Sequence, residues 1–188
     1  AENHRNGVNP QNIQVGTPYI GLEHMPRKSI ALDKRGEVRD VGSNKFKFRQ
    51  GNILFGKLRP YFHKVGVAVE DGICSTDILV ISPKESNWFS FVLSHVSSED
   101  FVCFTDTCST GTKMPSTKWN DMSLYDLVVP DGIISEAFNQ IVTPNIQRIR
   151  SNILENRTLS NLRESLLPKL LSGELRIPDA EKLVETVV

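Results

Sequence analysis

Between residues 146 and 171 the sequence repeats apolar residues every three or four positions, which is the period of one long helix. Thr143 followed by Pro144 is a typical helix start, because threonine caps the first turn and proline lacks an N–H that this turn leaves unpaired. Gly173 is typical of the position just after a helix. The sequence therefore predicts a helix from Thr143 to Ser172, about 43 Å long at about 1.5 Å per residue.

The apolar residues of this helix would form a seam along one side, with Asn156 at one seam position. A polar residue in such a seam can fix the register between two helices. The helix could lie on its own domain, or it could pair with a helix of another chain. We favour pairing as a coiled coil, because the sequence predicts no second helix of comparable length to cover the seam. The residues expected to pair are Ile146, Ile149, Ile153, Asn156, Leu159, Leu162, Leu166 and Leu170.

Upstream of the helix, short runs have the patterns of strands. Residues 45–49 alternate a cation with phenylalanine, which on a strand places three cations on one face and two rings on the other. Residues 53–59 predict a buried strand that continues into a second basic alternation, so that two neighbouring strands show one basic surface. We expect further strands over 65–69, 76–81, 101–104 and 124–129, a helix packed on the sheet over 87–96, and a loop over 106–119.

These elements predict an α/β fold class of the α+β kind, a globular domain with a mixed sheet followed by a long C-terminal coiled-coil helix. We expect three segments: the globular domain over residues 1–132, the long helix region over 133–175 and a tail over 176–188. A chain of 188 residues can bury its own core, so neither a metal nor a disulfide framework is needed for folding.

The charges are segregated along the chain, although the formal net charge is zero. Residues 27–64 carry eleven basic side chains against three acidic ones, a local net charge of +8, and residues 65–141 carry the reverse, −8. A local basic face attracts a phosphate backbone within a Debye length of about 8 Å, whatever the total charge. A solvated basic face is the plain alternative, but the strict alternation in 45–49 favours a polyanion partner.

The cellular compartment follows from the cysteines and the N-terminus. Cys74, Cys103 and Cys108 cannot all pair with one another, and the first residues lack the apolar core of a signal peptide. The longest apolar runs are far shorter than the roughly 20 residues of a membrane-spanning helix. We therefore expect a cytoplasmic protein with free thiols and no membrane segment.

The common signatures of catalysis are missing from the sequence. It contains no glycine-rich phosphate loop, no His-Glu-x-x-His, no paired Cys-x-x-Cys and no Asn-Pro-Pro-Tyr or Asp-Pro-Pro-Tyr run of an amino-methyltransferase. His95, Cys103 and Cys108 lack the spacing of a metal site, and a cysteine nucleophile has no better support. We expect no metal, no cofactor, no catalytic residue and no enzymatic activity.

Five stretches stand out together: residues 16–23 (GTPYIGLE), 48–61 (FRQGNILFGKLRPY), 71–77 (DGICSTD), 109–115 (STGTKMP) and 162–175 (LRESLLPKLLSGEL). In this order they resemble the target-recognition domain and the conserved helix of the specificity subunit of type I restriction–modification systems. The resemblance covers nearly the whole chain. A complete specificity subunit usually carries two recognition domains and two long helices, whereas this chain has one of each, so the resemblance implies half a subunit, either a natural half-length protein or a fragment.

The resemblance implies a division of labour. Residues 1–132 would be a target-recognition domain that binds double-stranded DNA and reads one part of a split target, without catalysis. Modification subunits would bind S-adenosylmethionine and methylate adenine, and a restriction subunit would use ATP to translocate and cleave DNA. The long helix would set the distance between the parts by pairing with that of a second half-subunit or a second copy.

The residues expected to contact DNA combine the basic positions of the two strands with a loop of hydroxyls and glycine. The cations would bind phosphates, and the glycine would allow the backbone to approach DNA closely. We expect about half of the five strand cations to touch DNA. The candidates are Lys45, Lys47, Arg49, Lys57, Arg59, Tyr61, Thr110, Gly111, Thr112 and Lys113.

Three other functional classes stay open on the residues alone. A non-specific single-stranded nucleic-acid binder needs exposed aromatic rings for base stacking, whereas the alternation turns Phe46 and Phe48 inward. A stand-alone nuclease or a helical adaptor that binds only protein would also fit a long helix. Metal-dependent cleavage would support the nuclease, and failure to bind any duplex in low salt would support the adaptor.

Overall fold

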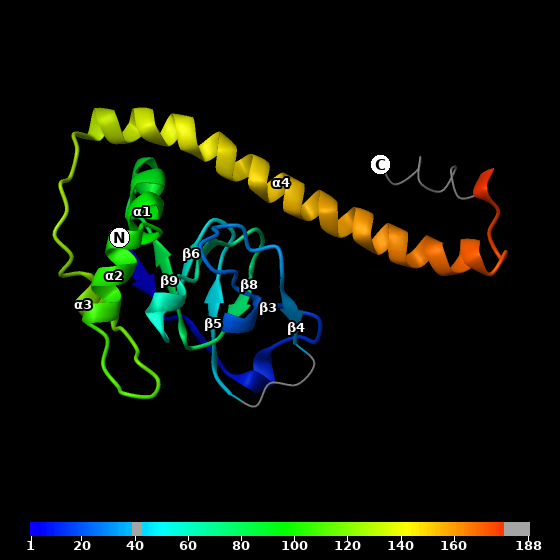
Figure 1. Cartoon of the computed structure of the whole chain (residues 1–188), viewed down its shortest axis with the longest axis horizontal. Helices are drawn as coiled ribbons and strands as arrows, with labels where there is room; N and C mark the ends of the chain where they lie inside the picture. The colour runs from blue at the N-terminus through cyan, green and yellow to red at the C-terminus, as the bar shows by residue number, and fades with distance from the viewer. Residues whose placement is uncertain (39–42, 179–188) are drawn as a thin grey trace. The chain divides into compact units, whose positions relative to one another are not determined.

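The computed structural model describes residues 1–38 and 43–178 (Figure 1). Arg39 and Asp40 of the basic segment and residues 179–188 of the predicted tail lie outside the described residues. The strands are β1 Glu2–His4, β2 Gly7–Val8, β3 Pro18–Ile20, β4 Gly36–Glu37, β5 Lys45–Phe48, β6 Ile53–Gly56, β7 Val65–Val67, β8 Gly72–Cys74 and β9 Ile78–Ser82. The helices are η1 Pro10–Asn12, η2 Leu22–His24, η3 Pro60–Phe62, η4 Ser86–Trp88, α1 Phe89–Val96, α2 Glu99–Thr107, α3 Trp119–Met122 and α4 Gly132–Leu171.

The strands form two sheets. The first has the order β1–β9–β6–β7 with antiparallel pairs. The second has the order β2–β5–β8–β3–β4, in which β3 and β8 run parallel and the other pairs run antiparallel. The predicted mixed sheet and α+β fold class with a long C-terminal helix are therefore confirmed.

Strand β6 lies at the centre of the core because both faces of its sheet are covered. On one face Ile53 and Phe55 pack with residues of α1 and α2. On the other face Leu54 and Val80 pack with Phe48 and other residues of the second sheet. This burial explains the uninterrupted apolar runs of β6 and β9, because a strand buried on both faces has apolar residues at every position instead of alternating with polar ones.

Strand β5 has the predicted alternation. Phe48 is buried and Phe46 is half-buried, and both pack in the cluster that includes β6. Lys45 and Lys47 alternate with the rings and so lie on the opposite face of the sheet. The helix predicted over 87–96 is also confirmed, as η4 followed by α1.

The predicted strand over 101–104 is wrong, because these residues lie within α2. Ser98 caps this helix: its hydroxyl oxygen accepts a hydrogen bond from the backbone N–H of Phe101 at 3.2 Å. Glu99 and Asp100 occupy the first turn, where the helix dipole favours negative charge.

The predicted strand over 124–129 is also wrong, because this segment contains no regular element. Tyr125 packs against the core cluster, but Leu124 is 72% exposed and Val128 is 89% exposed. An apolar run predicts a strand only where a sheet edge is present to pair with it, and this segment pairs with none of the described strands.

The second basic strand is shorter than predicted, because β6 ends at Gly56. Arg59 has a left-handed backbone (φ 51°), which a strand does not allow. Leu58 pairs instead with Ser116 in an isolated bridge. Lys57 and Arg59 therefore lie in the connection between β6 and η3, not on a strand surface.

Helix α4 begins eleven residues before the predicted start. Its first turn is capped by Asp131, whose carboxylate accepts a hydrogen bond from Ile133 N at 3.0 Å. Thr143 lies inside the helix, and the helix continues through Pro144 at the cost of one backbone hydrogen bond. The predicted end is confirmed to within one residue, and Gly173 after it has a left-handed φ of 75°.

The chain divides into two compact units, residues 1–147 and the residues from 148 onward. In the first unit, Ile146 of α4 packs against the cluster that contains Phe55. In the second unit, α4 keeps exposed apolar side chains: Leu159 is 45% exposed and Leu171 is 80% exposed. The predicted division at residues 132 and 175 and the predicted coiled coil stay predictions.

Within the described residues, no helix combines the length and the apolar character needed to cross a membrane.

Candidate nucleic-acid interface

The basic residues of β5 differ in their surroundings. Lys45 donates a hydrogen bond from Nζ to the Ser43 hydroxyl at 2.6 Å and lies 5.8 Å from the centre of the Tyr19 ring. Burial, followed by the charge of Glu23, raises the pKa of Tyr19, so the phenol beside Lys45 stays neutral at pH 7. Lys47 and Arg49 are exposed. These two cations are free to meet a ligand, whereas Lys45 is partly held by its own loop.

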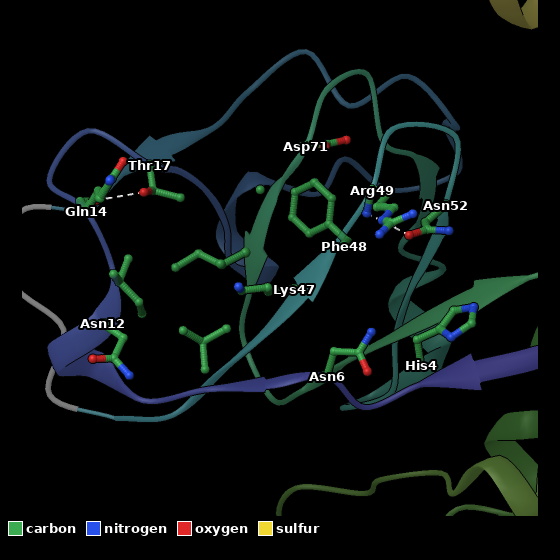
Figure 2. Close-up of a pocket in the computed structure, with 14 residues that line it drawn as sticks. His4, Asn6, Asn12, Gln14, Thr17, Lys47, Phe48, Arg49, Asn52 and Asp71 are labelled. Carbon is green, nitrogen blue, oxygen red and sulfur yellow. Dashed lines mark hydrogen bonds between the residues drawn. The ribbon is translucent and has the colours of Figure 1, made fainter.

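Lys47 and Arg49 border an open pocket of about 670 Å³ (Figure 2). The amide side chains of Asn6, Asn12 and Gln14 also line this pocket. None of these three amide groups has a hydrogen-bond partner within residues 1–38 and 43–178. An amide offers both a donor and an acceptor, and such pairs match the edges of bases in the major groove.

The wall of the pocket is built by the β5–β6 turn. The Asn52 side-chain oxygen accepts a hydrogen bond from Arg49 N at 2.7 Å, and an Asp71 oxygen accepts one from Gln50 N at 2.8 Å. Figure 2 shows Arg49 and Asn52 together at this rim, with Asp71 on the neighbouring loop. The turn therefore fixes the backbone that carries Arg49.

The structure brings Arg59 and the loop of residues 110–113 together. Arg59 N donates to Pro115 O at 2.7 Å, and the Arg59 guanidinium donates to Lys113 O at 3.3 Å. Thr110 pairs with Ser116, which closes the loop into a tight hairpin. Gly111 has a φ of 110°, which a residue with a Cβ rarely adopts, so the hairpin needs glycine at this point.

The other candidates of this second region have mixed environments. Lys57 Nζ lies 4.0 Å from an Asp77 carboxylate oxygen, so its charge is partly balanced. Tyr61 is 51% exposed, and Thr112 is exposed in the hairpin. The predicted residues thus fall into two groups, one along β5 and one around the β6–η3 connection with the hairpin.

The pattern of cations in the sequence predicts the basic residues of β5, but it gives no indication of the amides that line the pocket beside them. Asn6, Asn12 and Gln14 belong to a short stretch rich in amides, and that composition was the signal available. Their common pocket depends on the pairing of β2 with β5, which brings residues of the N-terminal stretch beside Lys47.

The thiols and histidines form no recognisable reactive centre in the described part of the chain. No group of three histidine, cysteine, aspartate or glutamate side chains is placed to hold a metal ion among residues 1–38 and 43–178. Burial raises the pKa of the Cys74 thiol to about 12, so this thiol stays protonated. Cys103 is exposed and Cys108 is half-buried.

No protein-family model matches the chain. Three curated relatives do match, and all are type I restriction enzyme specificity subunits. The EcoDI subunit of Escherichia coli is 31% identical over 144 residues, which are 72% of this chain and 31% of the relative. The MjaIX subunit of Methanocaldococcus jannaschii is 21% identical over 174 residues, which are 86% of this chain and 38% of the relative.

Two solved structures share the fold. The HsdS subunit from Thermoanaerobacter tengcongensis superposes with a TM-score of 0.55 at 18% identity, over 80% of this chain and 40% of that one. A chain from a structural study of the type I R-M system gives a TM-score of 0.54 at 17% identity, over 86% of this chain and 44% of that one. The chain spans less than half the length of these relatives. It is therefore a homologue of the specificity subunits of type I restriction enzymes and has their fold.

Proposed function

We propose that the chain is a DNA-recognition module of a type I restriction–modification complex, which binds double-stranded DNA, reads one part of a split target and carries no catalysis of its own. Its modification-subunit partners would methylate adenine with S-adenosylmethionine, and a restriction subunit would use ATP. The module itself would need no cofactor. It would work in the cytoplasm, where these partners and the DNA meet.

The observation that carries this proposal is the sequence match to the EcoDI specificity subunit over 72% of the chain. The geometry supports it. Exposed Lys47 and Arg49 flank unpaired amides in one pocket, an arrangement with groups for both phosphates and base edges. A third cation, Arg59, lies against a hairpin with exposed hydroxyls.

The long helix would supply the spacing. Leu159 is 45% exposed, and Leu167, about two turns further along the same helix, is 49% exposed. Large apolar side chains exposed close together on one helix favour a partner surface. Ile146 packs against the core cluster and Ile153 is 7% exposed, so we propose that the seam from Leu159 onward pairs antiparallel with an equivalent helix, from a second copy or from the other half of a complete subunit. Only the antiparallel arrangement places two recognition domains at opposite ends.

A reconstitution experiment tests the proposal. The chain would be mixed with its cognate modification subunits, S-adenosylmethionine and genomic DNA, and methylated adenines would be mapped by sequencing. Methylation at a defined split sequence only when the chain is present is the expected result. Methyl transfer by the chain alone, or methylation at the same sites without the chain, would contradict it.

A direct binding measurement separates the other classes. The chain should bind duplex DNA more tightly than single strands of the same sequence, because Phe46 and Phe48 are packed inward and are not available to stack bases. A preference for single strands would favour the single-strand binder. Metal-dependent cleavage of the duplex would favour a nuclease.

A further inference from the structure

Three cations surround one aromatic ring at the β6–η3 connection. The ring is that of Phe62, in η3. The guanidinium carbon of Arg27 lies 4.0 Å from the ring centre, and the Arg59 guanidinium carbon and the Lys64 Nζ each lie 6.0 Å from it. Tyr61 stacks edge-on against the same ring at 4.7 Å and is exposed. Cations that are remote in the sequence therefore meet at one place on the surface.

The positive charges of this cluster lack a paired carboxylate in the part of the chain that the structure describes. Within the described residues, Arg27, Arg59 and Lys64 form no ion pair. The Arg59 Nε is buried and has no hydrogen-bond partner. Lys64 donates only to the backbone oxygen of Leu22.

The acidic side chains near the cluster do not change this balance. The nearby carboxylate of Glu99 is taken by Lys28, at 2.6 Å. Glu23 lies close enough to raise the pKa of Lys64, but burial and the charge of Arg27 outweigh it and lower that pKa. The cations therefore repel one another, and an anion would relieve that repulsion.

The backbone around the cluster is held in a disfavoured conformation. Lys28, Arg59 and His63 have φ values of 52°, 51° and 49°, in the left-handed region that residues with a Cβ rarely adopt. Tertiary hydrogen bonds fix it: Lys28 N donates to His63 O at 2.9 Å, and the His63 ring donates to Ser97 O at 2.8 Å. Such local strain, concentrated at one surface cluster, is typical of a pre-organised binding site.

We infer that Arg27, Arg59 and Lys64 form a binding site for one phosphate diester of the backbone of duplex DNA. The inference rests on the proposed function. A phosphate fits because guanidinium groups donate in a planar fork to its oxygens. Because every nucleotide carries the same phosphate, this contact fixes the position of the domain on DNA and does not depend on base sequence.

The salt dependence of duplex binding tests this site. The dissociation constant of the chain for a mixed-sequence duplex would be measured from about 50 to about 200 mM salt. Arg27→Gln is the first variant, because Arg27 is exposed and its side chain makes no hydrogen bond or ion pair among the described residues, so the fold should be unaffected. Its log–log salt slope should fall by about 0.9, the value for one lost phosphate contact.

Two further variants complete the test. Arg27→Gln combined with Lys64→Met should weaken duplex binding further but lower the slope by the same amount of about 0.9, because the site holds a single phosphate. Lys84→Gln is the matched control. Lys84 is exposed and follows the last residue of β9, whereas Gly56, next to the β6–η3 connection, pairs with the first residue of β9, Ile78. The slope of this variant should therefore stay near that of the wild type. Thermal unfolding of each variant checks the fold. If the double variant is unfolded, the salt slope of the single variant alone decides the test.

Three outcomes would overturn the site. A wild-type slope in Arg27→Gln, with duplex binding intact, would remove the phosphate site and leave the proposed function standing. The same slope together with weaker binding to modification subunits would assign the cluster to an acidic protein surface. Absence of duplex binding by the wild type at low salt would overturn both proposals.

Discussion

Asn6, Asn12 and Gln14 carry the clearest role for single residues in the proposed function. Their amides line the same pocket as Lys47 and Arg49 and have no hydrogen-bond partner among the described residues. A cation and neighbouring amides can have separate roles: the cation binds a phosphate, and the amides form hydrogen bonds with a base edge. Base discrimination and salt dependence should therefore be separable by mutation.

Asn6→Ala and Gln14→Ala should change which sequences are bound without changing the salt slope. Each good bidentate amide–base pair contributes about 1–3 kcal/mol of discrimination, so selected duplexes should lose preference at one position. Selection from a randomised duplex library followed by sequencing measures this. Lys47→Ala serves as the contrast, because it should flatten the salt slope with the base preference kept. Unchanged preferences in both amide variants would place base reading elsewhere on the domain.

Residue positions with a local cause could be predicted from the sequence. The alternation of residues 45–48 is a property of one strand, and the structure places Phe46 and Phe48 inward as expected. The cluster around Phe62 was not predictable in this way, because Arg27 is brought to the ring only by tertiary contacts.

At the scale of elements, the packing of short strands depends on glycines that leave room for a neighbour. A Cβ added at Gly72 in β8 would lie 2.7 Å from the backbone oxygen of Pro18 and 2.7 Å from the Phe48 ring. The parallel pairing of β3 with β8 brings Pro18 to this position. The carbonyl is part of the paired backbone and cannot rotate away.

Gly72→Ala should therefore destabilise the globular unit by about 1–3 kcal/mol, as overpacking of a core does. Chemical unfolding followed by circular dichroism measures this. Gly7→Ala in β2 is the matched control, because a Cβ there meets nothing within 4 Å and should cost little. Equal midpoints for the two variants would mean that β3 and β8 are less closely packed than described.

The long helix makes a separate prediction about association. Leu159→Glu together with Leu166→Glu should leave the globular unit folded and make the chain monomeric, because charges cannot be buried in a helix seam without large cost. Sedimentation at about tens of micromolar checks this, with Glu155→Gln, at an exposed position, as the control. A wild-type chain that is already monomeric would count against self-pairing and leave pairing with another half-subunit.

Errors in the predicted elements have physical causes. Four apolar residues at 101–104 fit a strand or a helix equally well, and the Ser98 cap with two acidic residues after it was the deciding signal. Thr143 and Pro144 resemble a helix start, but Asp131 caps the helix earlier, and a long helix tolerates an internal proline. The helix end was predictable because Gly173 marks it locally.

At the scale of the whole molecule, the chain combines the fold of specificity subunits with two groups of candidate DNA-binding residues in its globular unit. The fold and the relationship to specificity subunits could be predicted from the order of short segments, because that order can be read directly from the sequence. The arrangement of the binding groups could not, since the pocket beside β5 and the cluster around Phe62 each combine segments remote in sequence. Base specificity should accordingly belong to the globular part as a whole.

Exchange of residues 1–132 for those of a relative with another target tests whether the globular part determines base specificity. The join at Gly132 is suitable, because a Cβ there meets nothing within 4 Å and the helix begins at that residue. The hybrid would be combined with the cognate modification subunits, and methylated adenines would be mapped across a genome. We expect methylation at sites that contain the donor's part of the target. Methylation that stays at the original sites would show that the bases are read outside residues 1–132 and would contradict this expectation.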